Sequence, residues 1–125
     1  MVKNLISLLA AIAVLAGLGA AERIYLDRAF SDVQTQLSAL YDKTVDRTAT
    51  EEDGMALQAL WNKEKRALHI FIPHADIREM DLWISESVYY LAGRDFKEAR
   101  AKLEVLIDYA ATVPNNYRFK IENLL

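Results

Sequence analysis

An uncharged apolar run near the N-terminus constrains this chain more than any other feature. It reads LISLLAAIAVLAGLGAA from Leu5 to Ala21, with Lys3 before it and Glu22 and Arg23 after it. A transmembrane helix needs about 20 apolar residues, and the run approaches that length when the flanking charged side chains reach back to the membrane surface. We therefore predict an N-terminal transmembrane helix that anchors the chain through residues 1–23.

A cleaved secretory signal is the alternative, because small residues end the run at Gly19, Ala20 and Ala21. The apolar core of such signals usually has about 7 to 15 residues, and this run of about 17 is longer, which favours a retained anchor. Either interpretation places residues 24–125 outside the cytoplasm. The expected location is therefore the cell membrane, with a single span and an extracytoplasmic C-terminal domain.

The anchor also bears on assembly. Gly17 and Ala21 are four residues apart, and small residues at this spacing let two membrane helices pack closely. A homo-oligomer is therefore one expected state. Small residues are also common in single membrane helices, so the pair does not by itself require an oligomer.

Composition excludes several classes of function for the remainder of the chain. The net charge is −3, and setting aside Lys3 leaves −4 for the part after Ala21, without a basic stripe that would neutralise phosphates of nucleic acid. Nucleic acid is therefore not an expected partner. Cysteine is absent, which excludes a disulfide framework and a thiolate zinc site.

Apolar residues after the anchor recur at helical spacing, and no alternating strand pattern competes with them. We predict an all-α domain over residues 24–125, a small antiparallel bundle of about four helices. The first apolar stripe comprises Leu26, Phe30, Val33, Leu37 and Leu40. The second comprises Met55, Leu57, Leu60, Trp61, Leu68 and Phe71. The third comprises Ile77, Met80, Ile84, Val88 and Leu91, and the fourth Ala99, Leu103, Leu106, Ile107 and Ala110.

Boundary residues separate these helices. Thr50 and Asp53 have the spacing of a capping box, which predicts the start of the second helix. Pro73 is expected to end it, because proline lacks the amide proton and restricts the preceding residue. Asp95 and Glu98 repeat the capping pattern before the fourth helix.

Two further boundaries are predicted near the C-terminus. Gly93 follows the third helix and is expected to adopt the left-handed conformation of a C-terminal cap. Pro114, followed by Asn115 and Asn116, is expected to end the fourth helix.

The stretch LHIFIPHADIREMDLWI, residues 68–84, contains both histidines and is the strongest candidate for a chemical site. His74, Asp76 and Glu79 could approach a metal ion, but no HExxH, CxxC or similar spacing supports one. Acidic residues also favour the positive end of a helix. We therefore predict that these residues shape the start of the third helix, and we assign no catalytic, cofactor-binding or metal-binding residue and no cofactor.

Several segments together resemble a bacterial family known as domain of unknown function 4363, found largely in Gram-positive bacteria. The resemblance rests on the apolar N-terminus, Trp61 with the lysine-rich turn after it, HIFIPHADI, the Tyr90, Leu91 and Asp95 pattern, and the ending IENLL. It implies a membrane-anchored helical domain outside the cytoplasmic membrane, with no established activity. It supplies no catalytic residue.

Three functions follow from these observations. The first is a noncatalytic module that binds a protein or a component of the cell envelope. The second is a tetratricopeptide-like adaptor, suggested by the order of Gly, Asp, aromatic, Ala and Leu residues in YYLAGRDFKEARAKLEVLIDYA, residues 89–110, although only one such unit is visible. The third is a metal-dependent enzyme centred on His74. We favour the first and do not expect an enzyme.

Overall fold

The computed structural model describes the backbone of residues 1–124 and the side chains of residues 1–114. It contains four α-helices: α1 (Val2–Val45), α2 (Glu51–Leu68), α3 (His74–Ala92) and α4 (Phe96–Leu124). No strand occurs in residues 1–124. The prediction of an all-α chain with one long apolar N-terminal helix is confirmed.

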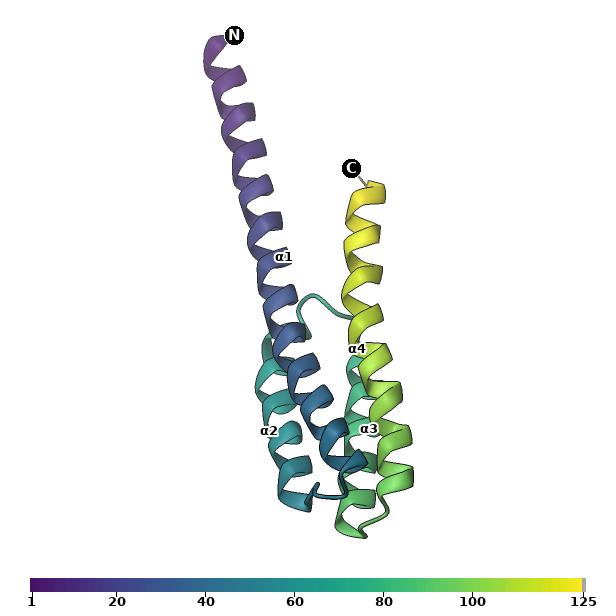
Figure 1. The fold of residues 1–125 in the computed structure, drawn as a ribbon. Helices are drawn as coiled ribbons and strands as arrows, with labels where there is room; N and C mark the ends of the chain where they lie inside the picture. Colours follow the sequence, from purple (N-terminus) through teal and green to yellow (C-terminus); the bar gives the residue numbers. More distant parts are fainter. Residues whose placement is uncertain (125) are drawn as a thin grey trace.

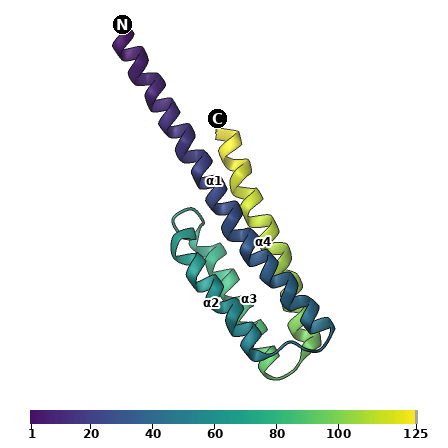
Figure 2. The same ribbon diagram turned by 60° about the vertical axis from the view of Figure 1, so that its left-hand side comes forward.

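The four helices form a bundle in which each helix contacts two neighbours (Figure 1). The α1–α2 and α3–α4 turns lie together at one end of the bundle, and the α2–α3 connection lies at the other. The N-terminal half of α1 projects beyond the bundle on the side of the α2–α3 connection. Figure 2 shows that α1 and α4 both extend past α2 and α3 on that side.

One apolar core holds the helices together. All five residues of the first predicted stripe are buried in it, together with Trp61, Leu68, Ile84 and Leu103, one or more from each other helix. Burying side chains of this size contributes about 1.5–3 kcal/mol each, before the entropy of ordering them is subtracted. The predicted apolar faces of the four helices therefore point to a common centre.

Met55 was assigned to that core, and this prediction is wrong, because its side chain is exposed. Gly54 takes the position against α3 instead. A Cβ atom at Gly54 would lie 2.9 Å from Leu91 Cδ1 and 3.2 Å from Val88 Cγ2. The glycine in the first turn of α2 therefore allows α2 and α3 to approach closely, and its neighbour Met55 points away.

The predicted capping box is present at Thr50 and Asp53, and the N-cap half of the second pattern is present at Asp95. The Thr50 hydroxyl accepts a hydrogen bond from the Asp53 amide at 3.2 Å, and the Asp53 carboxylate accepts one from the Thr50 amide at 3.0 Å. The Asp95 carboxylate accepts a hydrogen bond from the Glu98 amide at 3.2 Å. Pro73 does not directly end α2, which stops at Leu68, and instead occupies the N-cap position of α3.

The prediction of a left-handed Gly93 is wrong, since its φ is −82° and the left-handed residue is Arg94, with φ 56°. The Arg94 amide donates to the Leu91 carbonyl at 3.0 Å, and the Asp95 amide donates to the Tyr90 carbonyl at 2.9 Å. This pair of bonds is the Schellman motif, which places its left-handed residue one position after the helix cap. The cap falls on Gly93, so the strained position falls on arginine.

The prediction that Pro114 ends the fourth helix is also wrong, because α4 continues through Asn115 and Asn116 to Leu124. A proline inside a helix removes the amide that would bond to the carbonyl four residues earlier, here that of Ala110. The Gln34 side chain of α1 supplies the missing donor, with its Nε2 2.9 Å from the Ala110 oxygen. A contact from another helix therefore compensates for the proline.

Candidate functional site

The exposed half of α1 is the most unusual surface of the molecule. None of residues 1–25 is buried, and an 18-residue window of α1 has a mean hydropathy of 2.1 with none of it buried. Among the described residues, α1 alone is long and apolar enough to cross a membrane. The structure therefore gives one candidate membrane span. A cleaved signal has the same length and hydropathy, so the retained anchor stays a prediction from the sequence.

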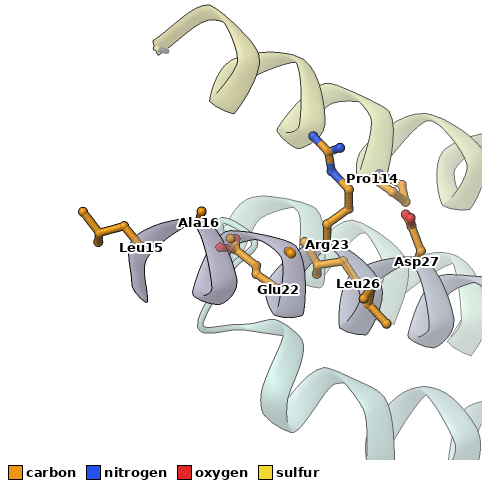
Figure 3. Close-up of a pocket in the computed structure, with 10 residues that line it drawn as sticks. Leu15, Ala16, Glu22, Arg23, Leu26, Asp27 and Pro114 are labelled. Carbon is orange, nitrogen blue, oxygen red and sulfur yellow. The ribbon is translucent and has the colours of Figure 1, made fainter. Parts of the chain in front are cut away.

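A pocket of about 500 Å³ lies where this exposed half meets the bundle, between α1 and Pro114 of α4 (Figure 3). Its lining changes character along α1. Leu15, Ala16, Gly19 and Ala20 are apolar, whereas Glu22, Arg23 and Asp27 are charged. Figure 3 shows Arg23 and Asp27 extending from α1 toward α4.

This pocket lies at the level where the predicted anchor ends. A surface that is apolar on one side and charged on the other matches the boundary between the hydrocarbon and headgroup regions of a bilayer. The pocket has no sequence signal, because it depends on how Pro114 of α4 lies beside α1. The partnership of Gln34 with the Ala110 carbonyl connects positions 76 residues apart and has no sequence signal.

The residues of the histidine stretch are engaged in structural contacts. The Asp76 carboxylate accepts a hydrogen bond from the Tyr109 hydroxyl of α4, and the Glu79 carboxylate accepts one from Trp83 Nε1 at 3.0 Å. His74 begins α3 and is exposed. The start of α3 has no side-chain capping bond, so Asp76 links α3 to α4 where we expected it to serve the helix end.

Asp81, the third acid of the stretch, also has protein partners. Its Oδ1 accepts hydrogen bonds from Trp61 Nε1 at 2.7 Å and from Lys65 Nζ at 3.1 Å, which joins α3 to α2. Within the part of the chain that the structure describes, no three His, Cys, Asp or Glu side chains are grouped so that they could hold a metal ion. The stretch thus connects α3 to α4 through Asp76 and α3 to α2 through Asp81, whereas the Glu79–Trp83 bond lies within α3.

The alternative functions depend on the histidine stretch and on the hairpin of α3 and α4. Ser87 of α3 is buried, and its hydroxyl donates to the Trp83 carbonyl at 2.9 Å. Helices α3 and α4 form the hairpin that suggested a tetratricopeptide-like unit. A single hairpin is insufficient for a repeat array, so that interpretation stays a prediction.

Comparisons of the chain with protein-family models, with curated proteins and with solved structures find no match. The resemblance to domain of unknown function 4363 therefore stays a prediction. Of the segments that carry it, HIFIPHADI forms the α2–α3 connection and the first turn of α3. The side chains of the ending IENLL lie outside the described residues.

Proposed function

We propose that this protein is a noncatalytic, membrane-tethered helical module, an antiparallel bundle presented outside the membrane by residues 1–23. One observation carries the proposal. Along the single helix α1, every residue up to Tyr25 lacks burial, whereas Leu26 and the apolar residues that follow it at helical spacing are buried in the bundle. Apolar surface of this extent on a water-exposed helix is unfavourable, and insertion into a bilayer removes it from water.

Continuity of α1 supports a tether of fixed length. The helix has 44 residues without an internal break, and it passes directly from the apolar half into the bundle core. From Ala21 to Val45 a helix rises about 36 Å at about 1.5 Å per residue. The far end of the bundle would therefore stand well clear of the membrane surface, where it can meet a protein or an envelope component.

The acidic side chains of the histidine stretch take part in structural contacts, which supports a structural role for this stretch. The Asp76 carboxylate joins α3 to Tyr109 of α4, and the Asp81 carboxylate joins α3 to Trp61 of α2. The Glu79 carboxylate bonds to Trp83 within α3. Close packing of two anchors through Gly17 and Ala21 would bring two bundles together. Both glycines of the anchor have open space around them in this single chain, since a Cβ at Gly17 or Gly19 would meet nothing within 4 Å.

Fractionation of cells that express the full chain tests this proposal. The double substitution Leu9→Arg and Ile12→Arg places two charges in the span, each costing about 2.5–3.5 kcal/mol at the centre of a membrane helix. We expect the wild-type protein in the membrane fraction with residues 1–21 retained, and the variant outside it.

The matched control is Ile70→Arg with Leu82→Arg, which changes two exposed apolar residues on the bundle. This variant should remain with the membrane. A wild-type protein that is recovered in soluble form and begins at Glu22 would contradict the anchor and establish the cleaved signal.

A further inference from the structure

The end of the bundle farthest from the apolar half of α1 carries a group of basic side chains, which we call the basic tip: Arg47, Arg94, Lys97 and Arg100. Arg47 comes from the α1–α2 turn, Arg94 from the α3–α4 turn, and the other two from the first turns of α4. These turns lie together at one end of the molecule (Figure 1). The four side chains line a common pocket of about 380 Å³.

The lining of this pocket is positively charged, whereas the protein has a net negative charge. Its lining contains four cationic side chains and one acid, Asp95, whose carboxylate already accepts the Glu98 amide at 3.2 Å. None of the four cations forms an ion pair within residues 1–114. A concentration of unpaired positive charge in a protein of net charge −3 is a local feature that attracts anions.

Two of the arginines are held in place by the backbone and by a shared aromatic ring. Arg47 and Arg94 have φ values of 60° and 56°, and each occupies the left-handed position of a Schellman motif. Their guanidinium carbons lie 5.7 Å and 5.8 Å from the centroid of the Phe96 ring, which is buried. Glycine is the usual residue at such a position because it lacks a Cβ atom, so both turns hold an arginine in a backbone conformation that is unfavourable for it.

Strained backbone that positions side chains with unbalanced charge is characteristic of ligand-binding sites. Like charges held around one ring repel each other, and an anion between them removes that repulsion. Guanidinium groups suit phosphate in particular, because their planar N–H donors form paired, charge-assisted hydrogen bonds to its oxygens. The pocket also adjoins the N-terminus of α4, whose positive end favours the same ligand.

We propose that the basic tip is a binding site for a phosphoryl group. This inference deepens the proposed function by naming the chemistry that the tethered bundle recognises. The position of the basic tip outside the cell rests on the proposed function. The binding of a phosphoryl group does not depend on that position. A tip about 36 Å beyond the end of the anchor lies several Debye lengths from the headgroups of its own membrane, so the phosphoryl group belongs to a soluble molecule or to another surface.

Titration calorimetry on the full chain in phosphatidylcholine nanodiscs tests the proposal, with inorganic phosphate and pyrophosphate as probes. We expect saturable binding of pyrophosphate to the wild type. The double variant Arg47→Gln with Arg94→Gln should weaken it by about tenfold or more, because each arginine contributes a charge-assisted hydrogen bond. A second variant, Arg47→Gly with Arg94→Gly, should lose the same affinity while relaxing both left-handed positions, so a folding defect cannot explain the loss.

The matched control is Lys63→Gln with Arg78→Gln, which removes two exposed charges elsewhere on the bundle and should change the affinity by less than about twofold. Flotation with vesicles that contain phosphatidylglycerol distinguishes the sources: binding to vesicles through the same arginines indicates a lipid headgroup, and binding to pyrophosphate alone indicates a soluble phosphate. Absence of saturable binding to both probes and vesicles, or an equal loss in the control, overturns the proposal. Membrane association of the same proteins reports on the tether independently.

Discussion

The internal proline of α4 and the glutamine opposite it allow a quantitative test of how the bundle is held together. Pro114 leaves the Ala110 carbonyl without its helical donor, and Gln34 of α1 donates to that carbonyl at 2.9 Å. Ala110 is buried and its bond to Gln34 is partly buried, so the carbonyl is less accessible to water than one on an exposed helix. The side chain of α1 thus satisfies a backbone group that the sequence of α4 leaves unpaired.

The expected cost follows from this arrangement. Gln34→Ala leaves a buried carbonyl without a partner, which should lower the free energy of unfolding by about 1–3 kcal/mol. In a Pro114→Ala background, the new amide at position 114 can bond to the Ala110 carbonyl, and Gln34→Ala should then cost less than about 0.5 kcal/mol. The double-mutant cycle should therefore give a coupling energy of about 1–2 kcal/mol.

Urea unfolding of the full chain in nonionic detergent, followed by the fluorescence of buried Trp61, measures these energies. Gln36→Ala is a suitable control, because Gln36 lies two residues away on α1 and forms no side-chain hydrogen bond within the described residues. This change should be nearly neutral. Equal costs of Gln34→Ala in the two backgrounds would refute the reasoning, since the glutamine would then act independently of the proline.

Three further predictions concern the core, a close approach between helices and an acid. Ile84→Ala should lower the free energy of unfolding by about 2–5 kcal/mol in the same assay, and a loss below about 0.5 kcal/mol would contradict its place in the core. Gly54→Leu should cost about 1–3 kcal/mol by forcing α2 from Leu91, and an unchanged stability would show that the helices separate freely. The Thr50 amide holds the pKa of Asp53 below its ordinary value, so this carboxylate stabilises the folded state above that value and loses its effect as the pH falls through the lowered pKa. Asp53→Asn should therefore make the free energy of unfolding fall less as the pH is lowered, which urea unfolding at several pH values measures. The same fall in the variant and in the wild type would contradict this.

Much of the fold could be predicted because local chemistry determines it. The stripe from Leu26 to Leu40 repeats at helical spacing, and the Thr50–Asp53 and Asp95–Glu98 pairs satisfy amides within their own first turns. These signals require no knowledge of distant residues. The apolar N-terminal helix was predictable for the same reason, since length and hydropathy are properties of one segment.

The errors arose where a distant contact decides the outcome. Pro114 was expected to end a helix, but Gln34, far away in the sequence, replaces the missing donor. Met55 was expected in the core, but the close approach of α3 to Gly54 turns its neighbour Met55 outward. The basic tip was not predicted, because the meeting of Arg47 with Arg94 depends on which turns lie together at the end of the bundle (Figure 1).

Labelling of single cysteines tests the proposal that α1 anchors the protein with its bundle outside the cell. The chain has no cysteine of its own, so Glu52→Cys at the far end of the bundle and Lys3→Cys before the apolar run each provide a unique thiol. In intact cells, a membrane-impermeant maleimide should label the membrane-bound protein at position 52, and it should label position 3 only after lysis. Labelling at position 52 that requires lysis would place the bundle inside the cell and contradict the account.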